Sequence, residues 1–202
     1  LNAASVLKLA TDAHDFSESI ALYNDLFSEK RRCSMIRYQP PFTLFADEKM
    51  ALLLARPGAA LQSLPALLEQ LQMWSAQAPD LYFCEEGLLQ FVRTGKMFDI
   101  PPDLCDAPDI PIRRELLLRL RRAAESDRRT LRIVDSARLA LTPSMCVNVF
   151  QGRGVVFCQA IQEPDGQYCR EYLMQDPILT EALLTYLDDG HASDWLRSQK
   201  YT

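Results

Sequence analysis

Hydrophobic residues recur at helical spacing through most of the first half of the chain. They lie three and four positions apart, so each stretch would carry one apolar face. Capping residues flank two of these stretches: Asp47 precedes one as an N-cap, and Gly95 follows another as a C-terminal cap. The apolar run Leu81–Cys84 also fits a short strand, but we favour a helix there. The predicted helices span Asp15–Glu29, Asp47–Arg56, Leu61–Trp74 and Asp80–Thr94.

The pattern changes in the second half of the chain. After one more helix, several segments are rich in Val, Ile, Phe, Tyr and Cys, which is typical of strands. Turn sequences containing Gly152 and Gly166 separate three of these segments and predict an antiparallel meander. Asp176 would cap a last helix, with Pro177 at its first helical position. The predicted elements are helix Pro111–Glu125, strands Leu131–Val134, Met145–Phe150, Val155–Ile161 and Tyr168–Met174, and helix Asp176–Asp189.

These elements predict an α+β protein, with an N-terminal helical half followed by a small antiparallel β-meander backed by helices. The segment Asp99–Asp109 contains three prolines, which predicts a semi-rigid linker or a long loop. The expected organisation is therefore a mainly helical subdomain (1–98), the linker (99–109) and an α+β subdomain that contains the meander (110–202). A length of 202 residues suits one ample domain or two small ones.

The six cysteines include no Cys-x-x-Cys pair, and the chain has only two histidines. Zinc ligands usually come in close pairs, so we expect no metal site and six reduced, structural thiols. A two-residue turn in the first hairpin of the meander would pair Phe150 with Val155. That register turns Cys146 and Cys158 to opposite faces of the sheet. A disulfide between them would require another register, and a redox-sensing role stays open as an alternative.

Charge and motifs exclude several other functions. The net charge of −5 is unlike that of a globally basic nucleic-acid-binding protein. No apolar run reaches the roughly 18 residues of a membrane helix, and the first residues lack the pattern of a signal peptide. We therefore expect a cytoplasmic protein without membrane contact. No phosphate-binding glycine loop, Gly-x-Ser-x-Gly elbow or His-x-Lys unit occurs, so we expect no cofactor, name no catalytic residue and do not favour an enzyme.

One local anomaly is the segment Arg113–Arg138, which holds nine arginines against four acidic residues. Arginine forks suit phosphate and carboxylate recognition. The ordinary explanation is a solvated helix surface paired with the acidic remainder of the chain. The alternative is an anion site, which would make the protein an enzyme that binds an anionic substrate.

The stretch Leu81–Gly95, LYFCEEGLLQFVRTG, resembles part of a known class of domain. Together with Pro111–Leu117, Leu131–Asp135, the meander and the helix opened by Asp176-Pro177, it is similar to the C-terminal, non-DNA-binding domain of certain bacterial helix-turn-helix transcriptional regulators. The resemblance implies a region that senses an effector or mediates dimerisation, while a separate N-terminal domain binds DNA. We recognise no helix-turn-helix in this sequence, and the resemblance transfers no functional residue.

From this we expect a ligand-sensing or dimerisation domain, with a small-molecule or peptide effector and a homodimer, and with DNA bound only through a domain outside this sequence. A protein-interaction adaptor is a further alternative to the enzyme. Ligand pockets form preferentially where subdomains meet, and they combine aromatic walls with a few polar anchors. The candidate ligand-binding residues are Arg37, Trp74, Tyr82, Phe91, Arg93 and Arg114. Their alternative role is to complete one continuous core.

Overall fold

The fold is built on one seven-stranded mixed sheet with the strand order β1-β7-β6-β5-β2-β3-β4. The computed structural model describes residues 5–12, 17–54, 73–74, 76–77, 79–99, 106–126, 131–134, 141–163 and 166–188. Strands β2, β3 and β4 run parallel to one another, and every other neighbouring pair is antiparallel. The strands are β1 (Ser5–Asp12), β2 (Cys33–Arg37), β3 (Asp80–Phe83), β4 (Leu131–Ile133), β5 (Met145–Phe150), β6 (Gly154–Glu163) and β7 (Gly166–Gln175).

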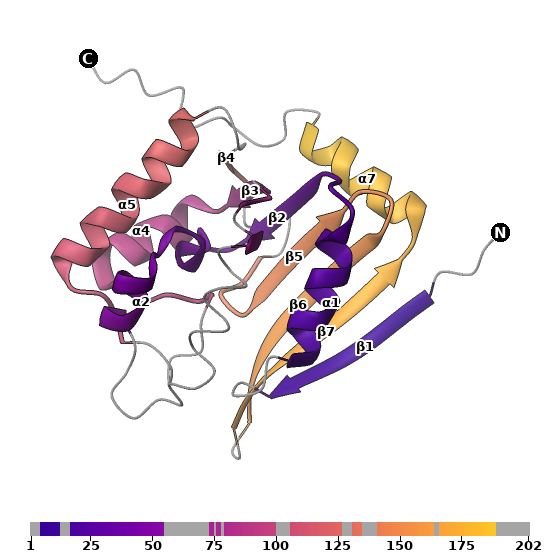
Figure 1. Cartoon of the computed structure of the whole chain (residues 1–202), viewed down its shortest axis with the longest axis horizontal. Helices are drawn as coiled ribbons and strands as arrows, with labels where there is room; N and C mark the ends of the chain where they lie inside the picture. The colour runs from indigo at the N-terminus through magenta and orange to yellow at the C-terminus, as the bar shows by residue number, and fades with distance from the viewer. Residues whose placement is uncertain are drawn as a thin grey trace.

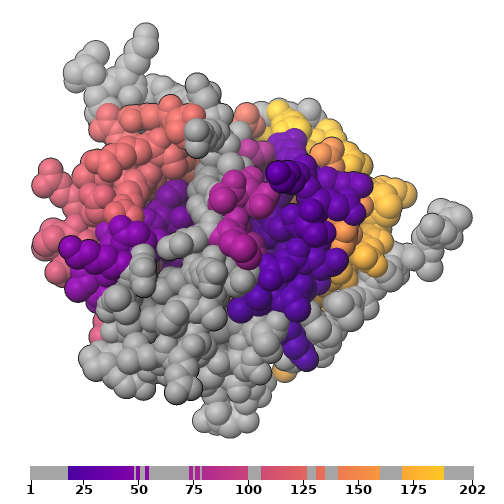
Figure 2. All heavy atoms as spheres, viewed as in Figure 1, coloured from indigo at the N-terminus to yellow at the C-terminus, as the bar shows by residue number. Residues whose placement is uncertain are grey.

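Helices cover both faces of the sheet. The described helical segments are α1 (Ser17–Ser28), the 3₁₀ turn η1 (Phe42–Phe45), α2 (Glu48–Leu54), α4 (Glu85–Thr94), α5 (Ile110–Glu125) and α7 (Pro177–Asp188). Figure 1 shows α1 in front of the antiparallel strands, with α2, α4 and α5 grouped beside the parallel ones. In Figure 2 the atoms of α1 form the indigo part of this face and those of α5 the salmon part.

Alternating residues of the strands divide the core into two clusters. Met35 packs in the cluster that holds Tyr23 of α1 and Phe91 of α4. Its neighbour Ile36 points to the opposite face and packs with Leu184 of α7. Successive strand residues point to opposite faces, so a single short strand contributes side chains to both clusters. This confirms an α+β protein, with a sheet that extends beyond the predicted meander.

The capping residues act as the sequence predicts. The Asp47 carboxylate accepts a hydrogen bond from the Met50 backbone N–H at 2.8 Å and opens α2. Asp176 likewise accepts from the Ile178 N–H at 2.9 Å, and Pro177 is the first residue of α7. Gly95 ends α4 with a φ of 72°, in the left-handed region that favours glycine.

One prediction for the first half of the chain is wrong. Leu81–Cys84 is not the start of a helix, because Asp80–Phe83 forms β3 and α4 begins only at Glu85. Residues 1–98 also supply β1, β2 and β3 to the sheet, beside the helices α1, α2 and α4. Because β2 and β3 pair with β5 and β4, the sheet runs across the predicted boundary at 99–109. Most of the predicted helix Leu61–Trp74, and residues 100–105 of the predicted linker, lie outside the described residues.

The first hairpin of the meander has a different register from the predicted one. Its loop contains three residues, Gln151 to Arg153, and the pair that closes it is Phe150 and Gly154. The Arg153 N–H donates to the Phe150 carbonyl at 3.0 Å, and Gly152 adopts a φ of 71° in this loop. The extra loop residue shifts the pairing of β5 with β6 by one position. Side chains of the two strands that were predicted to lie on opposite faces of the sheet therefore lie on the same face.

Among the described residues, no helix combines the length and the apolar character that crossing a membrane requires.

Candidate functional site

A row of four polar side chains crosses the sheet on the face that α1 covers. Arg37 of β2 pairs with Cys146 of β5, Cys146 with Cys158 of β6, and Cys158 with Glu171 of β7. Residues directly opposite each other on neighbouring strands project from the same face of a sheet. We call Arg37, Cys146, Cys158 and Glu171 the cross-strand row. The sequence-based register had placed the two cysteines on opposite faces, and the three-residue loop corrects that prediction.

Helix α1 places Tyr23 directly against this row. The Tyr23 hydroxyl lies 3.2 Å from the Cys158 sulfur, and the Asn148 amide Nδ2 donates to that hydroxyl at 2.6 Å. The same amide lies 3.6 Å from the Cys158 sulfur and 4.0 Å from the Cys146 sulfur. One amide and one phenol therefore connect both thiols to α1.

Glu171 closes the row on its β7 side. The Cys158 thiol donates to Glu171 Oε1 at 3.7 Å, and Ser19 of α1 also hydrogen-bonds this carboxylate. Glu171 is only 4% exposed, so its charge is almost fully removed from water. Burial raises the pKa of Glu171 above its ordinary value, while the bonds from Ser19 and Cys158 and the charge of Arg37 act in the other direction.

Arg37 is the cation of the row, and Asp99 balances it from outside the sheet. The Asp99 carboxylate is held by Thr43, whose N–H and hydroxyl donate to Oδ2 at 2.8 and 2.7 Å. Burial raises the pKa of Asp99, and the two Thr43 bonds and Arg37 oppose that rise. Burial alone would lower the pKa of Arg37, but the negative charges of Cys146 and Asp99, among others, outweigh it and raise the pKa. The guanidinium therefore stays protonated.

Unpartnered polar atoms gather around this row. Among the described residues, six buried side-chain nitrogen or oxygen atoms have no hydrogen-bond partner. Four of them lie in the row or beside it: Arg37 Nε and Glu171 Oε2 in the row, Asp99 Oδ1 beside Arg37, and Asn148 Oδ1 beside the two thiols. Buried polar groups in folded proteins are nearly always paired with protein atoms or with water, so this cluster of exceptions is a candidate place for a bound water molecule or ligand.

The Cys146 thiol is acidic in this setting. Its hydrogen bond with Cys158, the charge of Arg37 and the Asn148 amide lower the pKa of Cys146 to about 7, while burial and Glu171 oppose them. The Cys33 thiol, buried on β2, is the contrast: burial raises its pKa well above the ordinary value. A thiolate is the nucleophilic form of cysteine, so Cys146 is more reactive than Cys33 near neutral pH.

We expect alkylation of native protein by iodoacetamide to reach half its maximal rate at Cys146 near pH 7. The thiolate is present above that pKa and lost below it, so labelling should fall as the pH decreases through 7. Cys33 should stay unlabelled until the protein is denatured. Mass spectrometry of peptides after timed labelling measures both sites, and a Cys146 midpoint near 9 would contradict the assignment.

The six predicted ligand-binding residues do not form one cluster. Arg37 belongs to the cross-strand row. Trp74 packs against Tyr23 of α1 with ring centroids 4.8 Å apart. Phe91 is fully buried and stacks on Phe42 at 3.7 Å. The remaining three lie elsewhere: Tyr82 on the opposite face of the sheet in the α7 cluster, and Arg93 and Arg114 exposed on α4 and α5.

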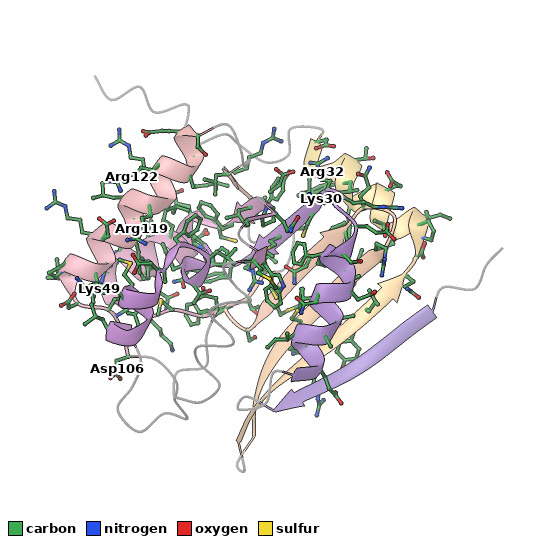
Figure 3. The ribbon with its side chains drawn as sticks, in the orientation of Figure 1. Lys30, Arg32, Lys49, Asp106, Arg119 and Arg122 are labelled. Atoms are coloured by element: carbon green, nitrogen blue, oxygen red, sulfur yellow. The ribbon has the colours of Figure 1, made fainter. Side chains whose placement is uncertain are left out.

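Five of the six arginines that the structure describes in the arginine-rich segment form contacts within the chain. Arg119, labelled on α5 in Figure 3, donates to the Phe45 carbonyl. It also forms an ion pair of 2.7 Å with Asp47, which precedes α2. Arg113 donates to two backbone carbonyls, and Arg132 donates to the Leu187 carbonyl. Arg121 and Arg122 form ion pairs with glutamates of the same helix. These contacts support the ordinary explanation, a helix surface paired within the protein, over an anion site.

Sequence reasoning found Arg37 but missed Tyr23, Asn148, Glu171 and the pairing of Cys146 with Cys158. The signal that could have found them is the register: three loop residues after Phe150 would have placed the two cysteines opposite each other. Among the described residues, no group of three or more His, Cys, Asp or Glu side chains could hold a metal ion. Comparison with protein-family models, with curated proteins and with solved structures finds no match to this chain.

Proposed function

We propose that this chain is the effector-sensing domain of a bacterial transcriptional regulator and that its effector binds at the cross-strand row. In this proposal the domain acts as a homodimer and reaches DNA only through a separate domain. The resemblance of the segment from Leu81 onward to regulator domains supports the regulatory role. The observation that carries the binding role is the gathering of unpartnered atoms along the cross-strand row.

The chemistry of these atoms selects the class of effector. Arg37 Nε is a donor on a fixed cation, which suits a carboxylate. Asp99 Oδ1, Asn148 Oδ1 and Glu171 Oε2 are acceptors, which suit the N–H groups of an ammonium. A small molecule with one carboxylate and one ammonium group satisfies both kinds of atom. We therefore propose an α-amino acid or a zwitterion of similar size.

Binding at this place would reach α1 directly. Glu171 is hydrogen-bonded to Ser19, and Asn148 to Tyr23, so two residues of α1 depend on groups that the effector would contact. An effector that draws Glu171 or Asn148 away from these bonds changes how α1 packs on the sheet. Such a ligand shifts the protein between two packings in proportion to its difference in affinity for them.

The test is a thermal-shift screen of free L-amino acids, with matched amines that lack the carboxylate and matched carboxylic acids that lack the amine. We expect at least one zwitterion to raise the melting temperature by roughly 5–10 °C at about 100 times its Kd, because binding only the native state adds about 2.7 kcal/mol. The amines and the acids should have little effect. Arg37→Met should abolish the shift, whereas Arg114→Met, at an exposed position of α5, should keep it.

Absence of any shift across the screen, or an unchanged shift in Arg37→Met, would contradict the binding site. The regulatory half of the proposal has its own test in the gene. We expect a helix-turn-helix to be encoded in frame upstream of Leu1, and we expect the isolated chain to show no sequence-selective DNA binding in a gel shift at about 100 mM salt.

A further inference from the structure

We propose that Cys146 and Cys158 form a peroxide-reactive pair, in which Cys146 reduces a hydroperoxide and Cys158 then closes a disulfide with it. This activity does not rest on the proposed effector or on the regulatory role. It uses the pairing of the two strands and the polar groups that surround both sulfurs.

The geometry of the sheet suits the disulfide. Cys146 and Cys158 are directly opposed on the antiparallel strands β5 and β6. Opposed Cα atoms in such a pair lie about 4.5–5.5 Å apart, within the range of about 4.4–6.8 Å that disulfides span. Both side chains project from the same face and hydrogen-bond each other. The disulfide therefore requires no change of register.

The two cysteines differ in a way that assigns their roles. Cys146 is more exposed than Cys158, which is only 7% exposed, so Cys146 is the first of the two that a small hydroperoxide would meet. The hydrogen bond with Cys158, the Arg37 cation and the Asn148 amide all favour the thiolate of Cys146 and lower its pKa. Redox-active cysteines typically combine thiolate character with access, and often stand next to a second cysteine that resolves the first product.

The first step is a two-electron oxidation of Cys146. Its thiolate attacks one oxygen of hydrogen peroxide, an S–O bond forms and the O–O bond breaks. The second oxygen leaves as hydroxide and takes a proton from solvent to become water. The product is a sulfenic acid at Cys146, adjacent to the Cys158 thiol.

The second step closes the disulfide. The Cys158 thiol passes its proton toward Glu171 Oε1, which lies 3.7 Å away, and its sulfur attacks the Cys146 sulfur. The S–S bond forms, the S–O bond breaks, and hydroxide leaves and is protonated to water. Two thiols and one hydrogen peroxide thus give one disulfide and two water molecules. Burial raises the pKa of Glu171, which makes this carboxylate a better base for the transfer.

Disulfide formation would also change the contact with α1. In the reduced protein the Tyr23 hydroxyl lies 3.2 Å from the Cys158 sulfur. The disulfide turns the Cys158 sulfur toward Cys146, so this contact is weakened. The same helix that would respond to the proposed effector would therefore respond to oxidation.

The experiment treats the fully reduced chain with a small excess of hydrogen peroxide and counts thiols after denaturation. Of the six thiols, two should be lost, and mass spectrometry of the digest should show one cross-linked pair containing Cys146 and Cys158. Cys158→Ser should instead accumulate a sulfenic acid at Cys146 that dimedone traps. Cys146→Ser should lose the peroxide-dependent disulfide, and Cys33→Ala, a buried cysteine outside the pair, should behave as the unmodified chain does.

Arg37 acts here as a positioning residue, and a pH profile separates that role from a structural one. Arg37→Met should shift the midpoint of the oxidation rate upward by about one pH unit, which slows the reaction about fivefold at pH 7, because the thiolate fraction falls from about one half to about one tenth. Arg37→Lys should restore most of the rate because it restores the positive charge. All variants are compared by thermal melting first, so that only folded proteins enter the comparison.

Six thiols remaining after treatment, or a cross-link between other cysteines, would overturn the proposal. So would a Cys146→Ser variant that is oxidised like the unmodified chain. These outcomes leave the effector screen untouched, because that screen is done on the reduced protein. Conversely, a chain that forms the disulfide but responds to no zwitterion overturns only the proposed effector.

Discussion

Replacing Gly87 with alanine should unfold the protein or destabilise it by more than about 4 kcal/mol. Gly87 lies in α4, where the helix meets the chain that follows β2. An added Cβ would lie 1.9 Å from the Tyr38 carbonyl oxygen and 2.7 Å from its carbon. Both are backbone atoms, and the same oxygen accepts a hydrogen bond from the Cys84 N–H. Helix α4 could make room only by moving away from the sheet.

The direction of this change in stability distinguishes Gly87 from a glycine at an ordinary helix position. In an exposed helix, glycine to alanine is stabilising by about 1 kcal/mol, because alanine is the better helix former. The matched control is Leu89→Ala in the same helix, where the side chain is 40% exposed and we expect little change. Urea denaturation of the purified variants measures both. A Gly87→Ala protein at least as stable as the unmodified chain would show that α4 does not lie this close to Tyr38.

The sequence predicts most elements correctly where caps and periodicity agree. Helix α5 and helix α7 are examples, since each begins at an aspartate cap and carries a clear apolar face. Strand β3 was misassigned because it lies between two parallel strands and is apolar on both faces, so its four residues show no alternation. A run this short cannot be distinguished from a helix by its period.

The candidate site could be predicted only in part, because the alignment of its side chains depends on the register of the strands. Arg37 was predicted as a ligand-binding residue, and the structure places it at one end of the cross-strand row. The three partners that follow it, Cys146, Cys158 and Glu171, come from different strands. Their alignment depends on the length of one hairpin loop. A difference of one residue in that loop decides whether the two thiols face each other or face apart.

The aromatic residues Phe91 and Trp74 had two alternative roles in the sequence. In the sequence, Phe91 and Trp74 fit the wall of a ligand pocket as well as they fit a core. The structure packs Phe91 against Phe42 with an interplanar angle of 22° and no exposed surface, and packs Trp74 against Tyr23 and Phe27. Their contacts are with other side chains of the core, which is the alternative that the sequence left open.

Phe91→Ala tests this assignment and should lower the free energy of unfolding by about 3–5 kcal/mol. The substitution removes a fully buried ring whose centroid lies 3.7 Å from that of Phe42, and it leaves a cavity between α4 and η1. For a chain of this length the melting temperature should fall by roughly 10 °C. Arg114→Ala is the matched control, because its side chain is exposed on α5 and no core contact is lost. If Phe91→Ala instead kept its stability and lost the response to a zwitterion, Phe91 would line the binding site, and the assignment of this residue to the core would be wrong.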